Sequence, residues 1–362
     1  MNNEAPAKSH AEVVEKTEKP KLSFPLIDIL KFVFALGIMA AHLILESGTF
    51  PWLFYPLSII SQLGVAFFFI SSGFLSAKKA DQITTPRQRS FSYLKIAFRH
   101  AILYSLWSLV YFLILLCQWL TKGFSISDSL LLFIRNFFIG GSYGQLWFLW
   151  ALVICDLVFA LFSLIRINHW ITFGLSLVLY LLFLLIGPYG FIFNSSELAS
   201  FTNLWFFPAL SYSFGRGFLY ISLGVLCCKL TAPKNNWLLF LSLFLSVAFY
   251  SIEFSLLEIY QHSFASIAFS LPVFSFLSLA LCQTLVLPAT PTQIWMRKMS
   301  ILIYVIHVAV FILYNQLIKV VSIPSLEGFI PFLLVGSFTI GLSAFIVFLS
   351  AKPKMRFLHY LY

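Results

Sequence analysis

The chain has 362 residues, of which 60% are hydrophobic and only 10% are charged, and its formal net charge is +10. Because soluble domains average about 25% charged residues, this composition excludes a water-exposed globular fold. It predicts an all-α, polytopic transmembrane bundle, since backbone groups inside a bilayer must be hydrogen-bonded within the protein. The five cysteines lie in apolar stretches without metal-ligand spacing, so we expect neither a bound metal nor a disulfide framework.

Three regions follow one another along the chain. Residues 1–22 are polar and mixed in charge, which predicts a disordered cytoplasmic tail. Residues 23–351 are the predicted transmembrane domain, and residues 352–362 are a short basic cytoplasmic tail. Ser129–Phe138 is weakly amphipathic and predicts a helix along the membrane surface, as does the start of the third span. About ten spans are long enough to cross a bilayer: 24–45, 53–77, 93–121, 144–165, 169–189, 213–230, 236–256, 263–287, 300–320 and 328–350.

The distribution of Lys and Arg over the loops predicts the orientation of these spans. With the N-terminus inside, only Lys122, Arg135 and Lys319 face outwards, because loops on the cytoplasmic side carry the excess of positive charge. Eighteen basic residues then face inwards: Lys8, Lys16, Lys19, Lys21, Lys78, Lys79, Arg87, Arg89, Lys95, Arg99, Arg166, Lys229, Lys234, Arg297, Lys298, Lys352, Lys354 and Arg356. This asymmetry accounts for the positive net charge without a nucleic-acid partner. It places both termini in the cytoplasm and predicts a multi-pass protein of the cell membrane.

The first span contains ionisable residues, which are costly inside a bilayer unless a partner or a function retains them. Lys31 and His42 are eleven positions apart, close to three helical turns and about 16 Å of helix, so they project from nearly the same face. Asp28 could pair with Lys31, whose side chain would then reach the inner surface; alternatively, Lys31 binds an anionic ligand from the cytoplasm. His42 is either a polar helix contact or a general base, because imidazole is the usual acceptor of a hydroxyl proton.

Polar residues in later spans are further candidates. Arg216 lies between two glycines that allow close approach, and it either anchors the interface or binds substrate or a developing oxyanion. His307 is either a satisfied polar contact or a functional group. Trp147 begins the fourth span, where it is either an interfacial anchor or part of an outward cavity. Four ionisable residues are predicted near outer helix ends and could assist a base there: Glu46, Glu253, Glu258 and His262.

In order and spacing, these motifs resemble those of the membrane-bound acyltransferase 3 family, and the resemblance covers residues 24–350. In that family the first helix begins Leu-Asp-x-x-Arg and carries a histidine after ten intervening residues. Here Asp28, Lys31 and His42 stand at those positions, with lysine in place of the usual arginine. The Phe-rich second span, with its Ser71-Ser72-Gly73 patch suited to tight helix packing, also matches. Three later segments match as well: 146–149, Arg216 with 223–226, and 300–307.

The resemblance implies transfer of an acyl group, usually acetyl from cytoplasmic acetyl-CoA, to a hydroxyl of a cell-envelope polysaccharide or lipid-linked sugar. The family's catalytic histidine maps to His42 and its donor-binding cation to Lys31, although lysine lacks the bidentate fork of arginine. We expect Arg216 to contact the donor, and Trp147 and His307 to contact the substrate. Membrane lipid, the envelope acceptor and a separate extracellular transferase are the expected partners.

The alternative function is transport of a small polar solute. Some relatives carry such a membrane domain fused to an amino-acid racemase and are thought to move serine across the membrane, and a buried polar stripe suits either function. The Lys–x10–His spacing favours the acyltransferase, because the resemblance ties it to acyl transfer.

Overall fold

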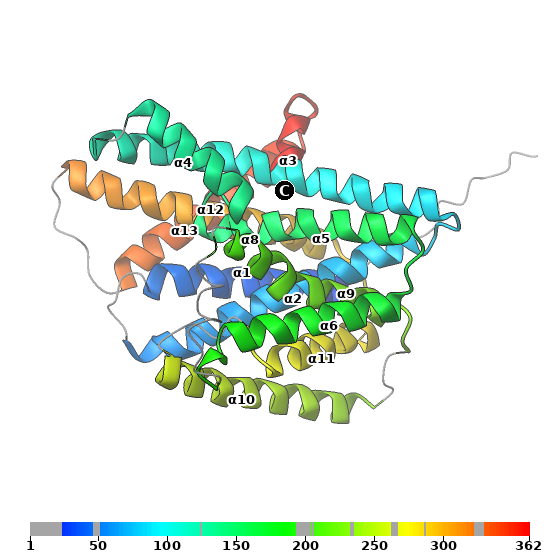
Figure 1. The fold of residues 1–362 in the computed structure, drawn as a ribbon. Coiled ribbons are helices and arrows are strands. Elements are labelled where there is room, and N and C mark those ends of the chain that lie inside the picture. Colours follow the sequence, from blue (N-terminus) through cyan, green and yellow to red (C-terminus); the bar gives the residue numbers. More distant parts are fainter. Residues whose placement is uncertain are drawn as a thin grey trace, which may run out of the picture.

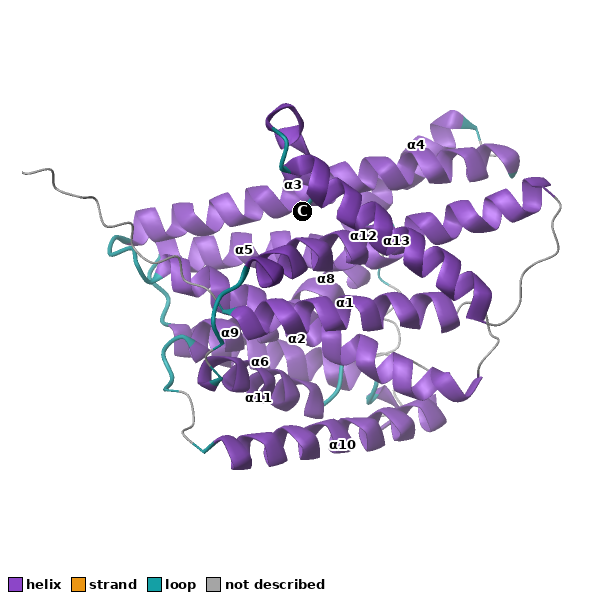
Figure 2. Ribbon diagram, turned by 180° about the vertical axis from the view of Figure 1, so that it is seen from behind, coloured by secondary structure: helices purple, strands orange, loops and turns teal. Residues whose placement is uncertain are grey.

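The computed structural model describes residues 24–45, 51–123, 125–192, 204, 206–231, 235–261, 267–285, 287–321 and 329–362. In these ranges the regular elements are helices and there is no strand, as Figure 2 shows. The predicted tail at 1–22 lies outside the described residues.

The helices are packed side by side into one bundle, drawn in Figure 1. The α-helices are α1 Pro25–Leu45, α2 Phe54–Ala80, α3 Pro86–Thr121, α4 Ile126–Ile139, α5 Trp147–Leu164, α6 His169–Ile186, α8 Phe207–Tyr212, α9 Phe218–Cys227, α10 Asn236–Gln261, α11 Ser270–Thr284, α12 Pro291–Val321 and α13 Phe329–Ser350. The short helical turns are η1 Pro51–Leu53, η2 Gly144–Leu146, η3 Gly190–Ile192, η4 Ser213–Gly217 and η5 Pro353–Leu361.

The structure confirms the predicted polytopic helical bundle. Eight helical stretches in the described residues are long and apolar enough to cross a membrane: α1, α2, α3, the run from α4 to α5, α6, α10, α12 and α13. The other two predicted spans are shorter or interrupted. α11 has 15 residues, or about 22 Å of helix, which is less than the hydrocarbon thickness of about 30 Å. The span predicted at 213–230 begins as η4, a π-helical turn between α8 and α9.

The segment around Ser129–Phe138 is helical as predicted and lies within α4. This helix begins at a capping serine: the side chain of Ser125 accepts a hydrogen bond from the amide of Asp128. The third span is also longer than predicted. α3 starts at Pro86 after the N-cap residue Thr85 and continues for 36 residues, or about 54 Å, so it extends beyond the thickness of one hydrocarbon core.

α2 and α9 make a backbone-to-backbone contact through two glycines. A Cβ atom placed at Gly73 would lie 2.3 Å from the Ile221 carbonyl oxygen, and one at Gly224 would lie 2.1 Å from the Ile70 carbonyl oxygen. No side chain larger than hydrogen fits either position unless the helices move apart. The contact confirms tight helix packing at the Ser71-Ser72-Gly73 patch, the interpretation that its small residues favoured.

The C-terminal ends of α2, α5 and α9 lie at one end of the bundle, together with the N-terminal end of α1 (Figure 1). Six of the residues that the charge count assigns to the cytoplasm lie at these ends or at the adjoining start of α3: Lys78, Lys79, Arg87, Arg89, Arg166 and Lys229. The clustering agrees with the predicted alternation of loops between the two sides of the membrane. The orientation relative to the cytoplasm stays a prediction.

The basic segment predicted as a tail at 352–362 is a helical turn, η5, that packs against the bundle. The indole nitrogen of Trp107 on α3 donates to the carbonyl oxygen of Leu361 at 3.1 Å. Tyr362 is buried, and its hydroxyl lies 2.6 Å from the side-chain oxygen of Ser350 at the end of α13. These contacts connect the last described residues to α3 and α13.

Candidate active site

A cavity of about 470 Å³ opens where the C-terminal half of α1 meets the starts of α2 and α5. It brings together three of the residues predicted from the sequence, His42, Trp147 and Arg216, although 174 positions separate the first from the last. The remaining lining residues are Ile38, Ala41, Phe54, Ser58, Ser61, Gln62, Val65, Gly144, Gln145 and Tyr304.

Two histidines meet beside this cavity. The rings of His42 on α1 and His307 on α12 have their centroids 5.2 Å apart. His307 is completely buried, and its Nδ1 lies 2.9 Å from the carbonyl oxygen of Ile303. A carbonyl oxygen can only accept, so in the neutral ring Nδ1 carries the proton and Nε2 is left as an acceptor. Among the described residues, Nε2 of His307 has no hydrogen-bond partner. The pair therefore places two imidazole rings side by side, with one ring nitrogen of His307 open to a partner.

A tyrosine hydroxyl from α3 is hydrogen-bonded to the backbone of α12 on both sides of His307. The hydroxyl of Tyr111 on α3 donates to the Val305 carbonyl at 2.8 Å and accepts from the Ala309 amide at 3.0 Å. These two backbone groups are the acceptor and donor of one α-helical turn, so Tyr111 bridges the turn that carries His307. The side-chain amide of Gln145, which lines the cavity, donates to the same hydroxyl. Tyr111 thus links the cavity wall to the backbone beside His307.

Tyr304 connects α12 to the start of α5. Its hydroxyl donates to the backbone carbonyl of Gln145 at 2.5 Å, and its ring lines the cavity. Neither Tyr304 nor Tyr111 was predicted from the sequence as a site residue. Both are aromatic residues in a chain that is 19% aromatic, so residue type alone carried no signal.

Arg216 projects from the π-helical turn η4, and π-turns inside α-helices are frequent at functional sites. Its guanidinium carbon lies 5.1 Å from the ring centroid of Trp147 and 5.0 Å from that of Tyr212. The flanking glycines accommodate bulky neighbours, since a Cβ atom at Gly215 or Gly217 would come within 3 Å of a phenylalanine ring. The close approach expected there is made by side chains. Two aromatic faces thus hold the cation at the cavity wall.

Lys31 does not line the cavity. Its ammonium lies over the ring of Phe68, 5.9 Å from the centroid, and the ring of Phe68 lies 6.1 Å from that of Tyr304. Aromatic rings therefore lie between Lys31 and the cavity that contains His42. The two residues share a helix, but His42 lines this cavity and Lys31 does not.

The expected ion pair between Asp28 and Lys31 is not the one that forms. Asp28 is 2% exposed, and both of its carboxylate oxygens accept from Arg297 on α12, at 2.8 and 2.6 Å. This bidentate geometry is the strongest form of a carboxylate–guanidinium contact. The partner lies 269 positions away, so no local spacing could have indicated it.

Glu253, one of the carboxylates predicted to assist His42, has a structural role in this arrangement. It accepts hydrogen bonds from Tyr189 and from the amides of Phe269 and Ser270, where α11 begins. A carboxylate at a helix N-terminus satisfies amides that have no intrahelical partner. Glu46 and His262 lie outside the described residues.

The cavity combines the imidazole of His42 with polar groups that have no partner among the described residues. These are Nε of Arg216, Oε1 of Gln145 and the hydroxyl of Ser58. Buried polar atoms without partners are costly and are commonly completed by a ligand or ordered water. A proton acceptor, a fixed cation and open hydrogen-bonding groups that line one cavity are suited to a reaction at a hydroxyl or a carbonyl group.

A model of the acyltransferase domain family, acyltransferase 3, matches residues 24–348 of the chain. Among the curated proteins and the solved structures, none matches the chain significantly. The matched region runs from the start of α1 to the end of α13 and includes His42, Arg216 and His307. Since the match covers nearly all of its length, the chain belongs to the acyltransferase 3 family and is a multi-pass membrane acyltransferase.

Proposed function

We propose that the protein is an O-acyltransferase of the cell membrane. It transfers an acyl group, most simply acetyl from cytoplasmic acetyl-CoA, to a hydroxyl of an envelope polysaccharide or lipid-linked sugar. The observation that supports this proposal is the contact of His42 with His307 beside a cavity whose wall carries Arg216. Acyl transfer needs a base for the hydroxyl and a cation for the developing oxyanion, and this cavity offers both.

In the proposed reaction His42 is the catalytic base. It removes the proton from the acceptor hydroxyl while the oxygen attacks the thioester carbonyl. The guanidinium of Arg216 stabilises the negative charge that develops on the carbonyl oxygen. When the tetrahedral intermediate collapses, the new C–O bond remains, the C–S bond breaks, and the imidazolium returns the proton to the CoA thiolate. The reaction is balanced without a metal or a redox group.

The donor reaches this centre from the end of the bundle at which α1 begins. Lys31 and His42 are separated by about 16 Å of helix, a length that an extended pantetheine arm covers. We infer that Lys31 binds the phosphates of CoA and that the arm passes the rings of Phe68 and Tyr304. Trp147 lines the acceptor side, where its ring edge and Gln145 contact the sugar. A separate extracellular transferase can receive the product.

The transfer can be measured in inverted membrane vesicles, which expose the cytoplasmic face. With acetyl-CoA labelled in its acetyl group, we expect label in an envelope glycan as an ester that mild alkali releases. Right-side-out vesicles should incorporate none, because the donor cannot reach its site. Uptake of labelled serine by the same vesicles, with no ester-linked label, would overturn the proposal in favour of a transporter.

Replacing Lys31 by methionine should weaken binding of acetyl-CoA by more than tenfold, or about 1.4 kcal/mol, because the charge that faces the phosphates is lost. Lys31→Arg should bind at least as tightly, since it restores a bidentate donor. Isothermal titration of the purified proteins with CoA measures both. Equal affinity of Lys31→Met and the parent would leave Lys31 without a role in donor binding.

A further inference from the structure

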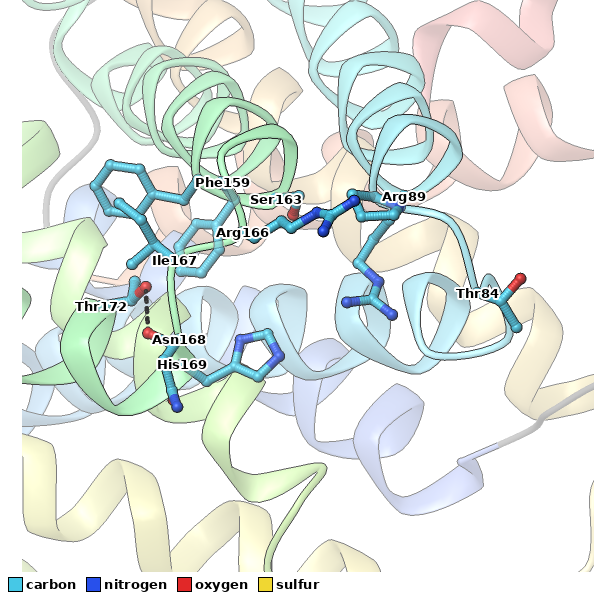
Figure 3. Close-up of a pocket in the computed structure, with 11 residues that line it drawn as sticks. Thr84, Arg89, Phe159, Ser163, Arg166, Ile167, Asn168, His169 and Thr172 are labelled. Atoms are coloured by element: carbon cyan, nitrogen blue, oxygen red, sulfur yellow. Dashed lines mark hydrogen bonds between the residues drawn. The ribbon is translucent and has the colours of Figure 1, made fainter.

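A second cavity, of about 610 Å³, lies between the starts of α3 and α6 and the end of α5 (Figure 3). It is at the end of the bundle where the basic turns gather, and neither His42 nor Arg216 belongs to it. Its lining includes Arg89, Phe159, Arg166, Asn168 and His169. The ring of Phe159 packs against Phe218 of α9 at 5.8 Å, which closes the cavity towards the middle of the bundle.

The cavity has an excess of positive charge. In the part of the chain that the structure describes, Arg89, Arg166 and His169 line it, and no aspartate or glutamate does. The nitrogen-bearing ends of these side chains point into the same space in Figure 3. The nearby carboxylate of Asp81 is paired with Lys229 at 2.7 Å, so it does not neutralise the arginines. Two guanidinium groups without a lining carboxylate form a site for an anion.

Arg89 is held in place with part of its hydrogen-bonding capacity unused. One terminal nitrogen donates to the Ile83 carbonyl at 3.0 Å, which fixes the side chain against the turn between α2 and α3. Its Nε is buried and has no partner among the described residues. A phosphate oxygen in the cavity would satisfy this donor, because guanidinium groups bind phosphate through paired N–H groups.

Arg166 occupies a backbone conformation that is unfavourable for an arginine. Its φ angle is 61°, in the left-handed region, where glycine is the least strained residue. This residue follows Ile165, the C-cap of α5, and the amide of Ile167 closes the turn on the carbonyl of Phe162 at 2.9 Å. Residues in sparsely populated backbone conformations cluster at functional sites and ligand clamps. An arginine at a position suited to glycine is therefore a candidate for a side chain whose charge is used.

The surface beside the cavity is apolar and exposed. Leu164 and Ile165 at the end of α5, and Trp170 and Ile171 at the start of α6, are each more than half exposed. A tryptophan at the end of a spanning helix is typical of the boundary between lipid tails and headgroups. A basic pocket between spanning helices at this depth is suited to a lipid headgroup whose acyl chains lie along the neighbouring apolar side chains.

We propose that this cavity binds the phosphate of an anionic membrane lipid, with Arg89 and Arg166 as its ligands and His169 and Asn168 beside them. The site is separate from the proposed acyl-transfer centre, so it does not depend on the identity of the acyl donor or acceptor. A bound lipid would join α3, α5 and α6 at the membrane surface, where two arginines otherwise repel each other.

The test is native mass spectrometry of the purified protein titrated with phosphatidylglycerol, with phosphatidylcholine as the uncharged comparison. The parent should retain phosphatidylglycerol preferentially. Arg89→Gln/Arg166→Gln should lower the apparent affinity by about tenfold or more, since charge-assisted hydrogen bonds to phosphate are lost. The matched control Arg87→Gln/Arg356→Gln removes the same charge from exposed positions that do not line the cavity and should bind as the parent does.

A second variant separates lipid binding from stability. Arg166→Gly removes the charge but suits the left-handed backbone, so it should fold at least as well as the parent and still lose affinity for phosphatidylglycerol. The proposal would be overturned if Arg166→Gly bound phosphatidylglycerol as the parent does. It would also be overturned if the control Arg87→Gln/Arg356→Gln lost as much affinity for this lipid as Arg89→Gln/Arg166→Gln. Displacement of the lipid by CoA but not by dephospho-CoA would overturn it as well, because the cavity would then belong to the phosphates of the acyl donor.

Discussion

Replacing His42 by glutamine should lower acyl transfer by about 10²–10⁴-fold, the contribution that a positioned base typically makes. A sugar hydroxyl is too weakly acidic to attack a thioester rapidly without a proton acceptor, and glutamine cannot accept that proton. His42 lines the cavity and its ring lies 5.2 Å from that of His307, so its loss removes the base at the reacting centre. Ester-linked label from acetyl-CoA measures the rate.

The same variant should bind CoA and unfold thermally as the parent does, because the predicted donor contact at Lys31 lies beyond the ring of Phe68. His359→Gln is the matched control. This histidine lies in η5, is hydrogen-bonded to the hydroxyl of Tyr362 and does not line the cavity. The control should therefore transfer acyl groups at the rate of the parent. Full activity of His42→Gln would remove His42 from the mechanism and leave another group as the base.

The helices could be predicted from the sequence because their signal is local. Each span is a continuous apolar run, and its ends coincide with polar or turn-forming residues. α1 was predicted at 24–45 and runs from Pro25 to Leu45; α13 was predicted at 328–350 and runs from Phe329 to Ser350. The predicted bounds of the spans at α11 and around η4 were less accurate, because composition reveals neither a π-turn nor the residue at which a buried helix ends.

The pairing of charges could not be predicted, because it depends on tertiary contacts. The spacing of Asp28 and Lys31 suits a local ion pair. The carboxylate of Asp28 is instead bound by Arg297, which lies on a different helix. A guanidinium offers two parallel donors where an ammonium offers a single point charge, so the more distant residue forms the stronger contact. Helical periodicity gives the direction of a side chain but not the identity of its neighbour.

The sequence indicated some of the residues that line the candidate cavity, and their roles stay predictions. His42, Trp147 and Arg216 were selected as polar or interfacial residues in apolar surroundings, and the structure brings them to one cavity. Tyr111 and Tyr304 were not selected, although they connect the cavity wall to α12. Their importance comes from single hydroxyl groups placed against backbone atoms of distant helices. Such contacts leave no periodic or compositional trace in a chain with 15 tyrosines.

The roles of the two nitrogens of His307 can be separated by substitution. His307→Asn places an amide near the position of Nδ1 and can keep the hydrogen bond to the Ile303 carbonyl, but it has no atom equivalent to Nε2. If Nε2 exchanges a proton with His42, this variant should fold like the parent and transfer acyl groups about 10²-fold more slowly. Its pH–rate profile should also differ from that of the parent, because only one of the two histidines remains at the reacting centre.

His307→Leu removes both nitrogens and is the comparison for a purely structural role. It fills the fully buried position with an apolar side chain of similar reach. If His307 serves only to fix α12 through Nδ1, His307→Asn should keep normal activity and only His307→Leu should lose it. Thermal unfolding together with the pH–rate profile of both variants decides between these roles. Parent-like rates for His307→Asn at every pH would confine the proton transfer to His42 alone, and His307 would then act through the position of the helix that carries it.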